Sequence, residues 1–120
     1  DSLIKYANDS IFLPMIDNNH WTVMCFNMID RRIDVLDSMG AKKSKRSKLN
    51  DENMRQKVIG RFLDVLDRIY PNEFTPVRNW KCHLALIPQQ VLENDCGFFA
   101  MKYIQFWDGR KLVKKVVPKD

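Results

Sequence analysis

Two strand-forming segments joined by a short polar turn constrain the fold of this chain more than any other feature. Residues 21–28 are rich in strand formers and lack helical spacing, and residues 33–37 alternate between apolar and polar side chains. The polar turn at residues 30–32 should fold the second strand back, antiparallel to the first. His20, at the end of one strand, is therefore expected to lie close to Asp37, at the end of the other.

Residues 50–70 carry the spacing of an amphipathic helix. Asn50 or Asp51 fits the N-cap position, and Pro71 ends the helix after Tyr70. We expect a structural helix that covers one face of a sheet. Its apolar side chains recur every three or four positions, at Met54, Val58, Phe62, Val65, Leu66 and Ile69.

Three shorter elements complete the expected domain. A strand over residues 11–16 precedes a turn at residues 17–19, and a strand over residues 80–88 ends at a proline. An apolar segment of helical length covers residues 96–107. Cys96 is therefore expected at or near the N-terminus of a helix.

The length and composition fit one globular domain. The 120 residues suffice for one small domain but not for two, and a content of 45% hydrophobic and 29% charged residues is typical of a folded, soluble protein. No apolar run approaches the ~20 residues of a membrane span, and no signal-peptide pattern opens the chain, so no membrane partner is expected. Because the first residue is Asp1 rather than Met, we expect a piece of a longer protein.

The three cysteines, Cys25, Cys82 and Cys96, form an odd and widely spaced set. Such a set is a poor disulfide framework and indicates a reducing intracellular compartment, the nucleus or the cytoplasm. No C-x-x-C pair is present, and the adjacent Cys82 and His83 would point to opposite faces of a strand. We therefore expect no metal site, and nothing indicates a cofactor.

The net charge of +5 is concentrated in the segment AKKSKRSK, residues 41–48, which holds five basic residues. Such a run is typical of a solvated loop, and contact with nucleic acid or an acidic protein is the alternative. No aromatic residues are interleaved with it, which argues against single-strand binding. Nucleic acid is therefore not expected as a partner. The alternative predicts salt-sensitive retention on DNA that is lost when the lysines are neutralised.

Cys96 differs from the other two cysteines in its surroundings. Cys25 and Cys82 lie inside apolar strands, where a cysteine is usually an inert packing residue. Cys96 follows a polar connection, precedes Gly97 and opens a helix. Unpaired N–H groups and the helix dipole at that position favour a thiolate and lower the pKa from ~8.5. Cys96 is thus a candidate nucleophile, and a buried packing thiol is the alternative.

A nucleophilic cysteine needs a base, and the base needs a residue that orients it. His83 lies inside a strand, where a packing or surface role is the simpler interpretation. His20 stands at a strand edge opposite Asp37 and is the better candidate. His20, Asp37 and Cys96 therefore form a candidate triad in that chain order.

Acyl transfer also needs a hydrogen-bond donor for the oxyanion. Gln89 and Gln90 lie just upstream of Cys96. A side-chain amide from either could join the backbone N–H of Cys96 in binding the developing negative charge. Considered in isolation, both are ordinary loop glutamines.

Four short motifs together resemble the catalytic core of the ubiquitin-like-protein-specific cysteine proteases, the Ulp or sentrin-specific (SUMO protease) family. They are HW at residues 20–21, LDS at 36–38, PQQ at 88–90 and NDCGFF at 94–99. Each motif alone is a weak signal, but their order and intervals fit the pattern of the family. The resemblance covers essentially the whole chain. It implies an α+β fold of the Ulp and adenoviral-protease type, with a central mixed sheet flanked by helices and the nucleophile at a helix N-terminus.

The resemblance also implies a role for each matching residue. His20 would be the general base, Asp37 its orienting partner and Cys96 the nucleophile. The second of the two glutamines, Gln90, would be the oxyanion-hole amide. Trp21 would line a narrow tunnel that admits the Gly-Gly tail of a ubiquitin-like modifier, because only residues without side chains can pass between apolar walls.

The implied activity is that of a thiol protease or isopeptidase. It would remove a ubiquitin-like modifier, with SUMO as the first candidate, from target lysines or mature its precursor, as a monomer without a cofactor. Family members carry a further stretch before the HW motif, so residues 1–120 are expected to form a single domain that is incomplete on its N-terminal side. One alternative is a weak or inactive family member that binds a modifier without turnover. Another is a viral-type protease of the same triad order that cuts polypeptides after Gly-Gly-like or Gly-X sites.

Overall fold

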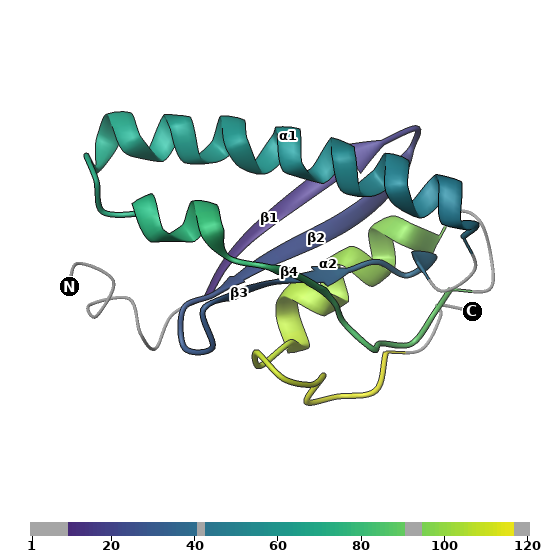
Figure 1. Cartoon of the computed structure of the whole chain (residues 1–120). Coiled ribbons are helices and arrows are strands. Elements are labelled where there is room, and N and C mark those ends of the chain that lie inside the picture. Colours follow the sequence, from purple (N-terminus) through teal and green to yellow (C-terminus); the bar gives the residue numbers. More distant parts are fainter. Residues whose placement is uncertain (1–9, 41–42, 91–94, 117–120) are drawn as a thin grey trace.

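A four-stranded sheet and two α-helices form the core of the structure (Figure 1). The computed structural model describes residues 10–40, 43–90 and 95–116. In chain order the elements are β1 (Ser10–Asp17), β2 (His20–Asn27), β3 (Arg32–Leu36), α1 (Lys45–Ile69), the 3-10 helix η3 (Thr75–Asn79), β4 (Cys82–Leu84) and α2 (Cys96–Phe106).

The sheet is mixed, with the strand order β1-β2-β3-β4. β2 pairs antiparallel with both β1 and β3, and β4 is parallel to β3. The antiparallel hairpin expected between residues 21–28 and 33–37 is therefore confirmed, with Val23 opposite Leu36. The expected α+β architecture, a mixed sheet flanked by helices, is confirmed as well.

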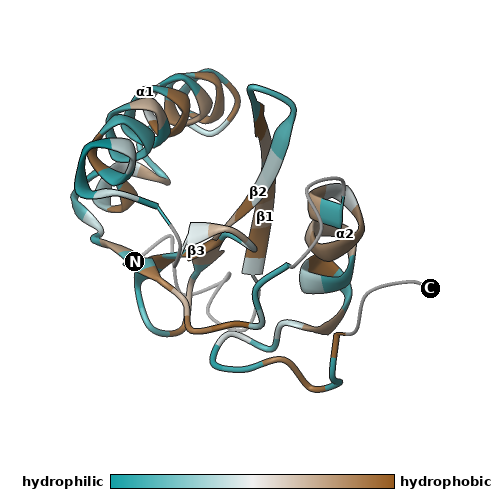
Figure 2. Ribbon diagram, turned by 90° about the vertical axis from the view of Figure 1, so that its right-hand side faces the viewer, coloured by the Kyte–Doolittle hydropathy of each residue, from teal (hydrophilic) through white to brown (hydrophobic). Residues whose placement is uncertain are grey.

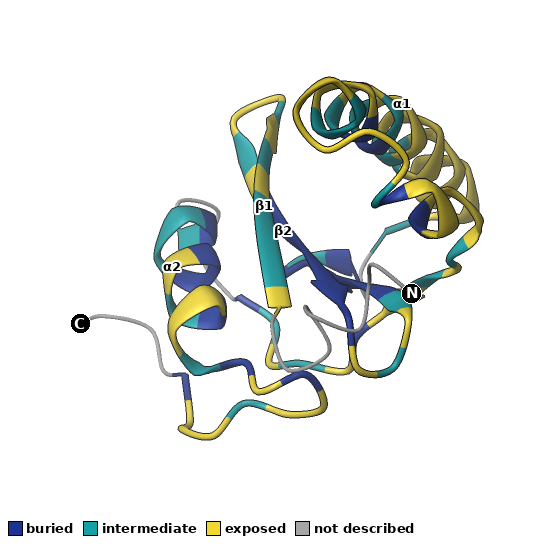
Figure 3. Ribbon diagram, turned by 90° about the vertical axis from the view of Figure 1, so that its left-hand side faces the viewer, coloured by how far each residue is buried: buried dark blue, intermediate teal, exposed yellow. Residues whose placement is uncertain are grey.

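Both faces of the sheet are covered, because α1 and α2 lie on opposite sides of it (Figure 2). Alternate residues of β2 serve the two sides: Met24 and Phe26 pack toward α1, whereas Val23 and Cys25 pack toward α2. This explains why residues 22–27 are all buried, without the alternation of a one-sided strand (Figure 3). The core on the α1 side consists of Met24, Phe26, Met28, Ile33, Ile59, Leu63, Phe74 and Val77, and that on the α2 side of Val23, Cys25, Leu36, Ala85, Phe99, Ala100, Tyr103, Trp107 and Val116.

Helix α1 begins earlier than the sequence indicates. The N-cap is Ser44, whose hydroxyl accepts a hydrogen bond from the backbone N–H of Ser47 at 3.2 Å, so the expected cap at Asn50 or Asp51 is wrong. Lysine and arginine are good helix formers, and residues 45–48 of the basic run form the first turn of α1 instead of a loop. Residues 41–42 of that run lie outside the described residues. The predicted end is confirmed, since α1 stops at Ile69, just before Pro71.

The buried face of α1 is only partly the predicted one. Ile59 and Leu63 are its buried residues, and Val58, Phe62 and Leu66 pack beside them. Three of the predicted core residues are exposed instead: Met54 at 38%, Val65 at 51% and Ile69 at 61%. The two buried positions, Ile59 and Leu63, each lie one position after the predicted Val58 and Phe62.

The strand expected over residues 80–88 is much shorter, since β4 covers only Cys82–Leu84. Its three residues pair with Ile33, Asp34 and Val35. The backbone of the residue on each side, Lys81 and Ala85, also bonds to β3. Cys25 is fully buried, as the sequence predicts. The same prediction for Cys82 is wrong: its side chain is only half-buried, because β4 is an edge strand. His83 is exposed on the same strand.

Across the ranges that the structure describes, no helix has the length and apolarity needed to cross a membrane.

Candidate active site

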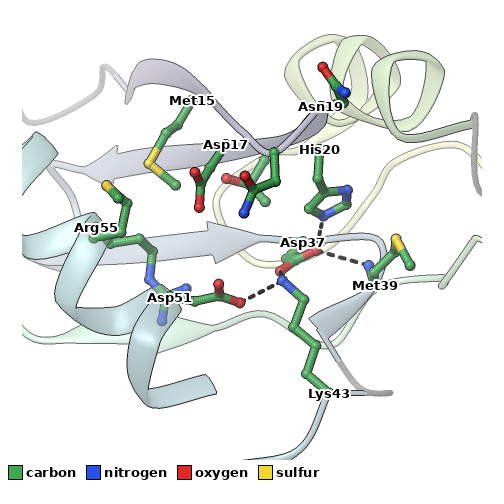
Figure 4. A pocket seen from close by; sticks show the side chains of 12 residues that line it. Met15, Asp17, Asn19, His20, Asp37, Met39, Lys43, Asp51 and Arg55 are labelled. Carbon is green, nitrogen blue, oxygen red and sulfur yellow. Dashed lines mark hydrogen bonds and ion pairs between the residues drawn. The ribbon is translucent and has the colours of Figure 1, made fainter. Parts of the chain in front are cut away.

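The hairpin brings His20 and Asp37 into direct contact (Figure 4). Asn18 and Asn19 both adopt positive φ, which fits a tight two-residue turn and starts β2 at His20. β3 ends at Leu36, so Asp37 follows at the same end of the sheet. Nε2 of His20 and Oδ1 of Asp37 are 2.7 Å apart, a short hydrogen bond that becomes an ion pair when the imidazole is protonated.

Asp37 is buried in a setting that keeps it ionised. Its Oδ1 also accepts a hydrogen bond from the backbone N–H of Met39 at 2.9 Å. Nζ of Lys43 lies 3.5 Å from Oδ2 of Asp37 and 2.5 Å from the carboxylate of Asp51 on α1. Burial alone would raise the pKa of Asp37, but the hydrogen bonds from His20 and Met39 and the charge of Lys43 lower it on balance.

His20 responds in the opposite direction. The hydrogen bond to Asp37 raises the pKa of His20 above its ordinary value, and the carboxylate charge and the Cys96 thiol add to this effect. Burial and the charge of Lys43 act against it but do not prevail. The carboxylate therefore stabilises the charge that His20 gains when it takes a proton. The side chain of His20 is 18% exposed.

Cys96 is the first residue of α2, as the sequence predicts, and is only 5% exposed. Burial raises the pKa of Cys96, but the backbone N–H of Trp21, the side chain and charge of His20, and the backbone N–H of Gly97 together lower it. The thiol itself donates to the backbone carbonyl of Asn19 at 3.6 Å. The thiol at the start of α2 thus contacts the β1–β2 turn.

The second ring nitrogen of His20, Nδ1, is not engaged by Asp37. Nδ1 is buried and has no hydrogen-bond partner among the described residues. Nε2 is held by Asp37, so the ring is fixed in orientation. An imidazole in this arrangement can take a proton from a thiol that turns away from the Asn19 carbonyl. The structure therefore brings His20, Asp37 and Cys96 together at one end of the sheet.

The two glutamines differ in their contacts. Nε2 of Gln89 donates to the backbone carbonyls of Asp37, at 3.1 Å, and Ile87, at 3.2 Å. Gln90 is 2% exposed, and its backbone N–H donates to the carbonyl of Ser38 at 2.8 Å. The hydroxyl of Ser38 donates to Oε1 of Gln90. Both glutamines therefore hydrogen-bond to the segment that carries Asp37. Gln89 bonds to the backbone of Asp37, and the buried Gln90 bonds to Ser38.

Trp21 follows His20 on β2 and is 38% exposed. A Cβ placed on Gly97 would lie 3.7 Å from Cδ1 of Trp21, so the indole lies against Gly97, the residue after Cys96. An exposed aromatic ring at this point can form an apolar wall beside the thiol.

A hollow of about 410 Å³ opens beside the His20–Asp37 pair, between the β1–β2 turn and the first half of α1 (Figure 4). Met15, Asp17 and Arg55 contribute to its lining, but Cys96 does not, so the hollow lies next to the pair and not over the thiol. In the described ranges, no three His, Cys, Asp or Glu side chains are grouped so that they could hold a metal ion.

Three residues of the site have no functional assignment from sequence. Lys43 falls in a basic run that predicts a solvated loop, and no local pattern indicates its contact with Asp37. Asn19 is predicted only as a turn residue, yet its backbone carbonyl accepts a hydrogen bond from the thiol of Cys96. Ser38 is part of the LDS motif, but only the fold shows that it contacts Gln90.

Comparisons with known proteins agree on one relationship. The sequence model of the Ulp1 protease family, C-terminal catalytic domain, matches residues 6–112. The ubiquitin-like-specific protease 1A of Arabidopsis thaliana is 29% identical over 107 residues, which are 82% of this chain and 18% of that protein. The catalytic domain of the Ulp1-like SUMO protease of Chaetomium thermophilum superposes with a TM-score of 0.57 at 23% identity, over 90% of this chain and 39% of that one.

The mixed sheet between two helices, with a cysteine at the N-terminus of α2, thus has the fold of a Ulp1-like protease catalytic domain. The chain belongs to the Ulp1 protease family. The resemblance that the four sequence motifs carry is therefore confirmed. This chain spans well under half the length of the two relatives described above.

Proposed function

We propose that this chain carries the catalytic centre of a thiol protease that cuts the peptide or isopeptide bond after the C-terminal Gly-Gly of a ubiquitin-like modifier, with SUMO as the first candidate. The observation that carries the proposal is the 2.7 Å contact of His20 with Asp37 beside a buried cysteine whose pKa is lowered. Proteins similar to this chain are named as a ubiquitin-like-specific protease and a SUMO protease. Their substrate class supports the proposal.

The reaction assigns one step to each member of the triad. His20 accepts the proton of Cys96, and the thiolate attacks the carbonyl carbon of the terminal glycine of the modifier. His20 then returns the proton to the leaving amine, and a thioester to Cys96 remains. Water attacks the thioester with His20 as base, which releases the modifier carboxylate and restores the thiol. Asp37 stabilises the imidazolium that forms between the two proton transfers.

Two further residues complete the proposed centre. The side-chain amide of Gln90 and the backbone N–H of Cys96 would donate to the oxyanion of the tetrahedral intermediate. Trp21 would form one wall of the passage for the Gly-Gly tail, which fits its position against Gly97. A tail without side chains can approach the thiol between such walls, whereas larger residues are excluded.

A modifier with an electrophile in place of its C-terminal carboxylate tests this proposal. We expect one covalent adduct, a band shifted by the mass of the modifier, and its loss in Cys96→Ala. Cys82→Ala is the matched control and should label normally, because Cys82 lies on the edge strand β4. Labelling that persists in Cys96→Ala would overturn the assignment of the nucleophile.

The same preparation separates the alternative activities. Cleavage of a SUMO precursor by the wild-type chain supports a protease, whereas modifier binding without an adduct or cleavage indicates a non-catalytic binding module. Cleavage of short peptides without a folded modifier would instead favour a polypeptide-cutting protease of the viral type.

A further inference from the structure

We infer that Ser38 is a positioning residue that sets the orientation of the Gln90 side-chain amide. The inference rests on the proposed function, in which Gln90 donates to the oxyanion. Ser38 follows Asp37 directly, so the same turn after β3 would serve the triad carboxylate and the oxyanion amide.

Two hydrogen bonds join Ser38 to Gln90, one from the backbone and one from the side chain. The backbone N–H of Gln90 donates to the carbonyl of Ser38 at 2.8 Å. The hydroxyl of Ser38 donates to Oε1 of Gln90. The two residues are 1% and 2% exposed, so solvent contributes little to their hydrogen bonding. Residue 90 is therefore held at both its main chain and the end of its side chain.

The bond from the Ser38 hydroxyl to Oε1 determines which end of the Gln90 carboxamide can donate. An oxyanion needs a donor, and only the NH₂ end of glutamine can donate, because the carbonyl end is an acceptor. A hydroxyl that donates to Oε1 commits the acceptor end and turns the NH₂ end to the opposite side. Loss of that hydroxyl removes the bond that holds the carbonyl end. An amide turned by half a turn would present its oxygen, which would repel an oxyanion. Ser38 therefore acts through Gln90 and needs no contact with substrate.

A double-mutant cycle measures this dependence with the fluorogenic C-terminal amide of SUMO as substrate. We expect Gln90→Ala to lower kcat by about 10²- to 10³-fold, the usual cost of one oxyanion donor. Ser38→Ala should lower kcat by about 10- to 100-fold with little change in KM, because misplacement of a catalytic group costs less than its removal. The double variant should be no slower than Gln90→Ala alone. Additive losses would show that Ser38 acts independently of Gln90 and would overturn the inference.

A second measurement reads the orientation without catalysis. The Nε2 signal of Gln90 in a ¹⁵N–¹H correlation spectrum, assigned by its loss in Gln90→Ala, should lie away from the solvent-exposed glutamine signals. We expect it to move toward them in Ser38→Ala, where the amide can rotate. A signal that does not move overturns the inference whatever the activity of the variant.

Controls separate a positioning role from a structural one. Ser47→Ala, at an exposed position of α1, should leave kcat unchanged. Alkylation of Cys96 by iodoacetamide develops no oxyanion on a carbonyl, so its rate should be equal in wild type, Ser38→Ala and Gln90→Ala. A slower alkylation in Ser38→Ala would indicate a disturbed fold and would count against the inference.

The outcomes also distinguish this inference from the proposed function. If wild type does not turn over or Gln90→Ala is fully active, the proposed function fails, and the catalytic role of Ser38 fails with it. If Gln90→Ala is impaired while Ser38→Ala is fully active, the proposed function stands and only the inference about Ser38 is overturned.

Discussion

Nε2 of His20 and Oδ1 of Asp37 lie 2.7 Å apart although 17 positions separate the two residues in the chain. The turn at Asn18 and Asn19 and the end of β3 place them at one end of the sheet. This contact fixes the orientation of the imidazole ring. Cys96 reaches the same place from α2, which packs on β2 through a separate core.

The charge of Asp37 should control the protonation of His20. In Asp37→Asn the carboxylate that raises the pKa of His20 is lost, while burial, which lowers it, remains. We therefore expect the pKa of His20 to fall, measured by NMR titration of its ring protons. Lys43→Met should move the pKa of His20 upward, because the charge of Lys43 lowers it in the wild type. An unchanged pKa in Asp37→Asn would contradict this electrostatic account.

The same pair predicts how stability depends on pH. The pKa of His20 is raised on folding, so its contribution is complete below the unfolded value of ~6.5 and is lost as pH rises through the folded pKa. The pKa of Asp37 is lowered, so its contribution is present above ~3.9 and is lost as pH falls through its folded pKa. Wild type should therefore exceed Asp37→Asn in urea stability most clearly between about pH 4 and 6.5. Ser47→Ala, at an exposed and non-titrating position of α1, is the control and should show no such window.

The three thiols should react in a definite order. The pKa of Cys96 is lowered, whereas burial raises that of Cys82 and raises that of Cys25 to about 11. At neutral pH we expect iodoacetamide to modify Cys96 first, Cys82 at higher pH, and Cys25 only on unfolding, as read by peptide mass spectrometry. His20→Ala should slow the first reaction, since His20 helps to lower the pKa of Cys96. Modification of Cys82 before Cys96 would refute this order.

A side chain at position 97 should slow substrate cleavage without lowering the stability of the fold. Its φ is not positive, and an added Cβ would make only an ordinary contact of 3.7 Å with Trp21. We expect Gly97→Ala to keep or raise stability, by at most about 1 kcal/mol, because alanine is the better helix former. Under the proposed function the methyl group narrows the passage beside Trp21, so cleavage of a SUMO precursor should slow while alkylation of Cys96 does not.

Gly60 offers the matched control for that substitution. It lies within α1, and a Cβ there would meet nothing within 4 Å. Gly60→Ala should show the same small gain in thermal stability without any change in cleavage. Equal cleavage rates for Gly97→Ala and Gly60→Ala would contradict the proposed passage.

The Tyr103 hydroxyl should stabilise the segment that leads to Gln90. It donates to the backbone carbonyl of Pro88 at 2.7 Å from a ring that is 1% exposed on α2. Removing it in Tyr103→Phe leaves that carbonyl without its partner, and we expect a loss of about 1 kcal/mol in the free energy of unfolding, measured with urea. Tyr70→Phe, at the exposed end of α1, should cost less than about 0.5 kcal/mol. Equal effects of both substitutions would refute a special role of the Tyr103 bond.

Several features of the fold and site follow from local sequence alone. Strand-forming residues and a polar turn predict the antiparallel hairpin, and with it the approach of His20 to Asp37. Pro71 predicts the end of α1, because proline has no N–H to continue a helix. The polar-to-apolar change at Cys96 predicts the start of α2. These predictions hold because each depends on residues that are neighbours in the chain or across one tight turn.

Other features were decided only by tertiary structure. Local sequence, without the family resemblance, does not distinguish the contacts of Gln89 from those of Gln90, because both contacts with the Asp37–Ser38 segment join residues 52 positions apart. The contact of Lys43 with Asp37, the short β4 and the shifted face of α1 likewise depend on how distant elements pack. Local patterns thus determine which elements form and where the candidate triad residues lie along them. Packing between those elements determines which side chains meet, because burial and hydrogen bonding act between residues that the sequence keeps far apart.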